Sequence, residues 1–67
     1  MESKKIRDLK KGEYFTLKPI EEPKETQVYI REDFDRSEGK YWGQKWSDIS
    51  VGRFFSGDKV VYVGFTF

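Results

Sequence analysis

The chain of 67 residues carries 13 basic and 12 acidic side chains, is 36% apolar, and has neither cysteine nor histidine. This length predicts a single small domain over residues 1–67, held together by packing alone because no disulfide can form. The missing residue types exclude the usual zinc ligands, a thiolate nucleophile and a Ser-His-Asp centre. We therefore expect no enzyme activity, no metal, no cofactor and no small-molecule substrate.

Charge is unevenly distributed along the chain. Residues 1–11 form a basic segment, and residues 19–26 form an acidic loop with two prolines. A net charge of +1 does not favour binding of duplex DNA through many phosphate contacts. No stretch resembles a signal peptide or reaches the length of a membrane span, so we expect a cytoplasmic protein without membrane contact.

The composition favours strands, because alanine is absent while β-branched and aromatic residues are common. We expect a tight helical turn at 7–11 with Gly12 at positive φ, and a polar turn at 47–52 capped by Ser47. Alternation and turn residues predict five strands, at 13–18, 26–36, 40–46, 53–55 and 59–67. The fold class expected is an all-β, five-stranded antiparallel barrel of the SH3-like kind, with a partly open OB-like barrel as the rival.

The register of the central hairpin determines which side chains are buried. A three-residue loop at 37–39, with Gly39 in the left-handed region, places Arg36 opposite Lys40. Phe34 then pairs with Trp42 on the core face, and the expected core is Phe15, Leu17, Val28, Ile30, Phe34, Trp42, Trp46, Val61, Val63 and Phe65. A two-residue loop at 38–39 would shift the register by one and expose both tryptophans.

Aromatic and basic residues alternate on the opposite face of this hairpin. The four tyrosines, Tyr14, Tyr29, Tyr41 and Tyr62, all fall on faces expected to point outward, which is also typical of half-buried tyrosines with solvated hydroxyls. Rings interleaved with cations are the pattern of single-stranded nucleic-acid binding. The candidate residues are Tyr29, Arg31, Tyr41 and Lys45, opposed by the charges of Asp33 and Asp35.

A second candidate surface suits a protein partner. SH3 domains hold peptides between an acidic loop and exposed aromatic rings, and the corresponding residues here are Tyr14, Glu21, Glu22, Glu25 and Trp42. The ALYDY-like segment and late proline of SH3 peptide binders are missing, so this likeness concerns barrel shape only. Asp33 to Gln44 imitates a calcium loop but fails at its glycine and glutamate positions. The terminal strand, if uncovered, could pair with a second copy.

Three stretches, LKKGEYFTLKPIEEPKE, VYIREDFDRSEGKY and GDKVVYVGFTF, resemble small uncharacterised proteins of gut bacteria and their phages or mobile elements. The resemblance covers nearly the whole chain. It implies a compact stand-alone cytosolic protein, and an accessory role in binding a host protein or nucleic acid. The function expected is a non-catalytic binding module that contacts single-stranded nucleic acid, with protein recognition as the alternative.

Overall fold

The computed structural model describes residues 2–66, which form six antiparallel strands in one sheet. The strands are β1 (Glu2–Lys5), β2 (Tyr14–Thr16), β3 (Val28–Asp35), β4 (Lys40–Lys45), β5 (Gly52–Phe55) and β6 (Val60–Val63). Short 3₁₀ turns lie at Ile6–Asp8 and Glu25–Gln27. The predicted all-β antiparallel fold is confirmed, with one strand more than expected. The sheet is barrel-like but not closed, and its order is β1-β6-β2-β3-β4-β5.

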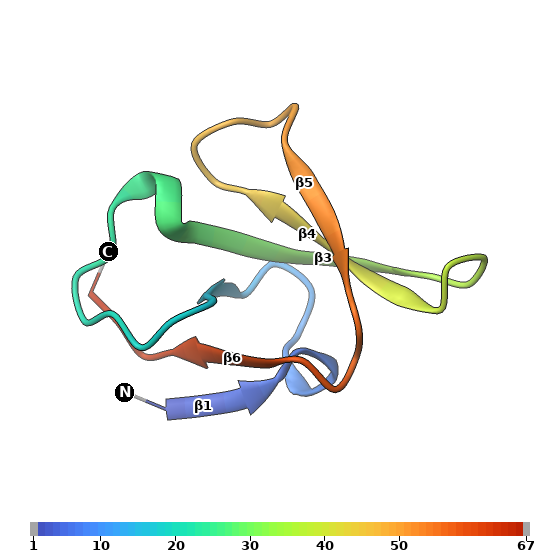
Figure 1. Cartoon of the computed structure of the whole chain (residues 1–67), viewed down its shortest axis with the longest axis horizontal. Coiled ribbons are helices and arrows are strands. Elements are labelled where there is room, and N and C mark those ends of the chain that lie inside the picture. Colours follow the sequence, from blue (N-terminus) through green and yellow to red (C-terminus); the bar gives the residue numbers. More distant parts are fainter. Residues whose placement is uncertain (1, 67) are drawn as a thin grey trace.

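The core lies between two parts of the bent sheet. In Figure 1, β1 and β6 run below, while β3, β4 and β5 cross above them. Phe15 and Phe55 meet edge to face between these parts, with ring centroids 5.6 Å apart. The buried apolar cluster consists of Ile6, Leu9, Phe15, Phe55, Val61 and Val63. Burial of Phe15, Val28, Val61 and Val63 agrees with the predicted core.

Strand β1 was not expected in the basic N-terminal segment. It pairs with β6 from Glu2 opposite Val63 to Lys5 opposite Val60. Strand β6 also pairs with β2, so the terminal strand lies inside the sheet and not at its edge. The condition for self-association through this strand, an uncovered edge, is therefore not met at Val60–Val63, because β1 pairs along it and β2 pairs at Tyr62. The edges of the sheet are β1 and β5.

The predicted register of the β3–β4 hairpin is also wrong. Asp35 pairs with Lys40, so four residues (36–39) form the loop, and Gly39 takes the expected positive φ of 66°. Asp35 Oδ1 accepts hydrogen bonds from the backbone N–H groups of Ser37 and Glu38, at 2.8 and 3.1 Å. The Asp35 carboxylate thus stabilises a longer loop than glycine placement alone predicts.

A second irregularity follows within β3, where the register shifts between Arg31 and Phe34. Beyond it, Arg31 pairs with Gly43. A side chain at position 43 would collide with the Phe55 ring, with Cβ only 2.8 Å from Cδ2, and would lie 3.2 Å from Cζ of Phe15. The two core rings therefore occupy the space that the absent side chain leaves.

Because Gly43 faces the core, its neighbour Trp42 faces outward. The predicted core positions of four residues are corrected accordingly: Phe34 and Trp46 are 47% and 43% exposed, and Ile30 and Trp42 are half-buried. Tyr29 and Tyr41, predicted to face outward, instead pack against the core cluster.

Candidate interaction face on strands β3 to β5

The side of β3, β4 and β5 turned away from the core, here called the outer face, collects most of the exposed large apolar side chains. The register aligns Tyr14, Ile30, Gln44 and Gly52 in one row across four strands. Trp42 lies beside Phe54 in the next row. Tyr14, Trp46, Phe54 and Ile49 are 40%, 43%, 36% and 88% exposed. Contiguous exposed apolar surface of this kind marks interaction sites in soluble proteins.

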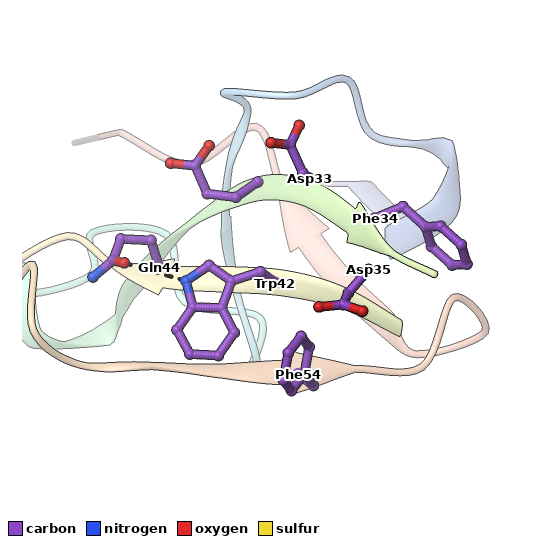
Figure 2. A pocket seen from close by; sticks show the side chains of 7 residues that line it. Asp33, Phe34, Asp35, Trp42, Gln44 and Phe54 are labelled. Carbon is purple, nitrogen blue, oxygen red and sulfur yellow. Dashed lines mark hydrogen bonds between the residues drawn. The ribbon is translucent and has the colours of Figure 1, made fainter. Parts of the chain in front are cut away.

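Two rings form the centre of a first hollow, the aromatic hollow, of about 390 Å³. The rings of Trp42 and Phe54 are 4.9 Å apart at their centroids and inclined by 72°. Figure 2 shows Asp35 beside these rings, while Phe34 turns away from them to pack against Tyr41 at 4.9 Å. The hollow is lined by Glu32, Asp33, Phe34, Asp35, Trp42, Gln44 and Phe54.

The acidic side chains that line the aromatic hollow differ in the ion pairs and hydrogen bonds that they already form. Asp33 forms an ion pair with Lys11 at 3.0 Å. Asp35 uses Oδ1 in the hairpin loop, and Glu32 has no ion pair among residues 2–66. Within the same described residues, no three carboxylates are grouped so that they could hold a metal ion. The acidic groups therefore give the hollow a negative charge without forming a metal site.

Gln44 organises the outer face and the loop after β4. Its Oε1 accepts a hydrogen bond from Trp42 Nε1 at 3.2 Å. Its Nε2 lies within hydrogen-bonding distance of three loop carbonyls, those of Asp48, Ile49 and Val51, at 3.0, 2.7 and 2.7 Å. One side chain thus positions both the indole and the loop that presents Ile49.

The same loop has its own internal support. Asp48 Oδ1 accepts hydrogen bonds from Ser50 Oγ at 2.6 Å and from its backbone N–H at 3.0 Å. These bonds, aided by the positive charge of Lys45, lower the pKa of the Asp48 carboxyl below its usual value. The sequence predicted a 3₁₀ turn capped by Ser47 here. The structure has a turn at residues 49–50 and no 3₁₀ helix in the loop.

A second hollow, the apolar hollow, of about 330 Å³ adjoins the first. Glu32 and Gln44 line both hollows, so the two adjoin on the outer face. The Trp46 ring, which borders the apolar hollow, packs against Tyr14 with centroids 5.6 Å apart. The remaining lining residues of the apolar hollow are Ile30, Lys45, Trp46 and Ile49.

The predicted nucleic-acid residues come together on the opposite, inner face. Tyr29 pairs with Lys45, and the guanidinium of Arg31 lies 4.4 Å from the centre of the Tyr41 ring. Tyr29 stacks on Phe15 at 5.6 Å and 17°. Arg31 Nε is buried without a hydrogen-bond partner. The four residues share a face as predicted, and Phe15 and Arg31 pack on the rings of Tyr29 and Tyr41, which are both partly buried.

The residues predicted for a protein partner are not gathered in one place. Glu21, Glu22 and Glu25 lie before the start of β3, whereas Trp42 lies near its far end. Tyr14 does belong to the outer face, next to Trp46. The acidic loop instead borders a smaller hollow of about 190 Å³, lined by Leu17, Lys18, Ile20, Thr26, Gln27 and Tyr29.

Sequence reasoning missed four residues of the outer face, namely Glu32, Gln44, Ile49 and Phe54, whereas exposure of Trp46 was the alternative expectation. Gly43 could have indicated their orientation, because a glycine inside a strand marks a close approach of neighbouring atoms. No family model matches this chain, and no match was found among curated proteins or solved structures. None of the helical segments in residues 2–66 has the length and apolar character needed to cross a bilayer.

Proposed function

We propose that the protein is a non-catalytic binding module that recognises a segment of another protein through its outer face. The observation that carries this proposal is the pair of adjoining hollows around Trp42, Phe54 and Trp46. Aromatic residues are enriched in protein interfaces, and tryptophans supply much of their binding energy. The resemblance to proteins of phages and mobile elements makes a host protein the partner we propose.

Single-stranded nucleic acid fits the outer face less well. Base stacking needs ring faces next to cations that follow the backbone. The aromatic hollow instead carries the carboxylates of Glu32 and Asp35, which repel phosphates. The cations Arg31 and Arg53 are directed over Tyr41 and Phe55, at 4.4 and 4.8 Å from the ring centres. These charges favour a protein segment as the ligand.

A peptide-display selection on the immobilised protein tests the proposal. We expect enriched peptides to change the fluorescence of the chain, because both of its tryptophans lie on the outer face. Binding should be lost in Phe54→Ser and retained in Val60→Ser. Val60 is a matched control, because it is also an exposed apolar residue, at 46%, but lies on β6.

Circular dichroism of both variants separates lost binding from lost folding. If Phe54→Ser does not fold, Ile49→Ser is the second test, because Ile49 is 88% exposed and contributes little to packing. Enriched peptides that bind Ile49→Ser and Phe54→Ser as well as they bind the unmodified chain would refute the proposal. So would a selection without enriched peptides, or saturable binding of oligo-dT that leaves tryptophan fluorescence unchanged.

A further inference from the structure

We infer that the corner between Trp42 and Phe54 is a seat for a lysine or arginine side chain of the partner segment. An apolar side chain next to it in that segment would occupy the apolar hollow. This inference rests on the proposed function, because it specifies what the outer face recognises. Three observations carry it: the ring geometry, the charge around the rings, and the positions of the chain's own cations.

The two rings pack edge to face against each other, and both line the aromatic hollow. Their planes meet at 72° with centroids 4.9 Å apart, and Figure 2 shows the indole and the phenyl ring side by side above β5. Aromatic faces attract cations within about 6 Å of the ring centre, and tryptophan does so most strongly. The methylene stem of a lysine or arginine also packs well on apolar walls.

Carboxylates complete the seat. Glu32 lines the hollow without an ion pair among residues 2–66, and Asp35 engages only Oδ1 in the hairpin loop. Asp35 Oδ2 therefore remains available to a ligand. Lys40 lies opposite Asp35 in the register, but no ion pair joins the two within the described chain. An incoming cation thus meets two carboxylates that form no ion pair within the described residues, and one of them, Asp35, lies beside the two rings.

The inner face shows that arginines of this chain do occupy ring faces. Arg31 lies 4.4 Å from the Tyr41 ring centre, and Arg53 lies 4.8 Å from that of Phe55. Among residues 2–66, no cation of the chain lies over Trp42 or Phe54. The rings of Trp42 and Phe54 therefore offer aromatic faces of the kind that Arg31 and Arg53 pack on. They lie in a hollow with carboxylates, and no described cation of the chain lies over them.

The test uses four short peptides, acetylated and amidated, that differ at one position beside an isoleucine. That position holds lysine, arginine, norleucine or glutamate. Two-dimensional NMR with millimolar peptide reports the indole N–H signals of Trp42 and Trp46. We expect the lysine and arginine peptides to shift both signals, with the norleucine peptide binding roughly tenfold more weakly and the glutamate peptide not at all. Comparing lysine with arginine shows which cation the seat prefers.

A double variant examines the carboxylates. Glu32→Gln with Asp35→Asn should reduce affinity for the lysine peptide roughly tenfold and weaken its dependence on salt. Asparagine keeps an oxygen that can accept the loop hydrogen bonds of Asp35. The matched control is Glu21→Gln with Glu22→Gln, which removes the same charge from the loop before β3 and should leave affinity unchanged.

The results distinguish this inference from the proposed function. If the norleucine peptide binds as tightly as the lysine peptide and shifts the same signals, the cation seat is wrong while recognition by the outer face stands. Absence of any Trp42 shift with the lysine and arginine peptides also overturns the seat. The seat is also overturned if the Glu32→Gln, Asp35→Asn variant binds the lysine peptide as tightly as the unmodified chain does. The proposed function itself fails if display selection yields no peptide that depends on the outer face, whatever the four short peptides do.

Discussion

Trp42 donates its indole N–H to Gln44, at 3.2 Å, from the same face of β4. Gln44 uses its amide nitrogen to hold the loop between β4 and β5. The position of a ring in the proposed binding site is therefore connected to the order of a loop that borders it.

The first prediction concerns this amide. Gln44→Leu should lower the free energy of unfolding by about 1 kcal/mol, because the hydrogen bonds lost are partly replaced by water. Hydrogen exchange of the Val51 and Lys45 amides should become faster, since Lys45 N–H bonds to Val51 O at 2.9 Å. Gln44→Glu should be more destabilising than Gln44→Leu, because a carboxylate would face the loop carbonyls. Equal exchange rates in Gln44→Leu and the unmodified chain would contradict this role.

The second prediction concerns the close contact at Gly43. Gly43→Ala should destabilise the fold by about 1–3 kcal/mol, the typical cost of overpacking a core. The added methyl would collide with Phe55, which is only 4% exposed and has little freedom to move. Urea denaturation measures the change. An alanine variant as stable as the unmodified chain would show that the two core rings are not confined as described.

Gly52 supports a third prediction, which concerns binding. An added Cβ there would lie 2.7 Å from Cε2 of Trp42 and 2.9 Å from the Gly43 carbonyl oxygen. Gly52→Ala should displace the indole, change its fluorescence maximum and weaken peptide binding at the aromatic hollow. The fold should remain, because Gly52 lies on the edge strand β5. Unchanged fluorescence and affinity would contradict the ring position.

The fourth prediction is a pH dependence. The folded-state pKa of Asp48 is lowered, chiefly by the hydrogen bond from the Ser50 hydroxyl. A depressed carboxyl pKa contributes stability that is present above the unfolded-state value of about 3.9 and is lost as pH falls through the folded value. Titration of the Asp48 side chain by NMR should give a pKa that rises in Ser50→Ala. Ser47→Ala, the control, should leave it unchanged.

The fifth prediction compares a buried ring with an exposed one. Phe15→Ala should cost about 3–5 kcal/mol, as expected for a buried aromatic side chain, because Phe15 is completely buried. Trp46→Ala should cost only about 1 kcal/mol, since the side chain is 43% exposed. Thermal and urea unfolding of the two variants measure the loss in free energy of unfolding that each substitution causes. Equal costs would support the hairpin register predicted from sequence.

Much of the backbone was predictable, because turns and strands depend on local chemistry. Gly12 and Gly39 adopt the positive φ angles expected of them, 92° and 66°. Each of the five predicted strands overlaps an observed strand, and β5 begins one residue before its predicted start. By contrast, Glu2–Lys5 has no alternating apolar pattern, and it becomes strand β1 only because β6 offers its backbone a partner.

The candidate site was less predictable, because it depends on which way β4 faces. The carboxylate of Asp35 and the register shift after Arg31 together change the pairing that Gly39 suggests. Beyond that shift the pairing differs from the predicted one by two residues, so Trp42 still shares a face with Ile30. That face is the outer one, because the rings of Phe15 and Phe55 pack over Gly43 on the other side. Phe54 could not be assigned to a site before its partner across the sheet was known.

The pairing of β1 with β6 also has a consequence for biosynthesis. Glu2 and Val63 are partners although nearly the whole chain separates them, so β1 has no place in the sheet until the ribosome has released β6. The β3–β4–β5 meander can form earlier from neighbouring residues, but Phe15 and Phe55 stay partly uncovered until Val61 and Val63 arrive. Such non-local pairing is typical of small β proteins that fold in milliseconds to seconds. A nascent chain stalled before β6 would therefore expose aromatic surface and become a substrate for chaperones or proteases.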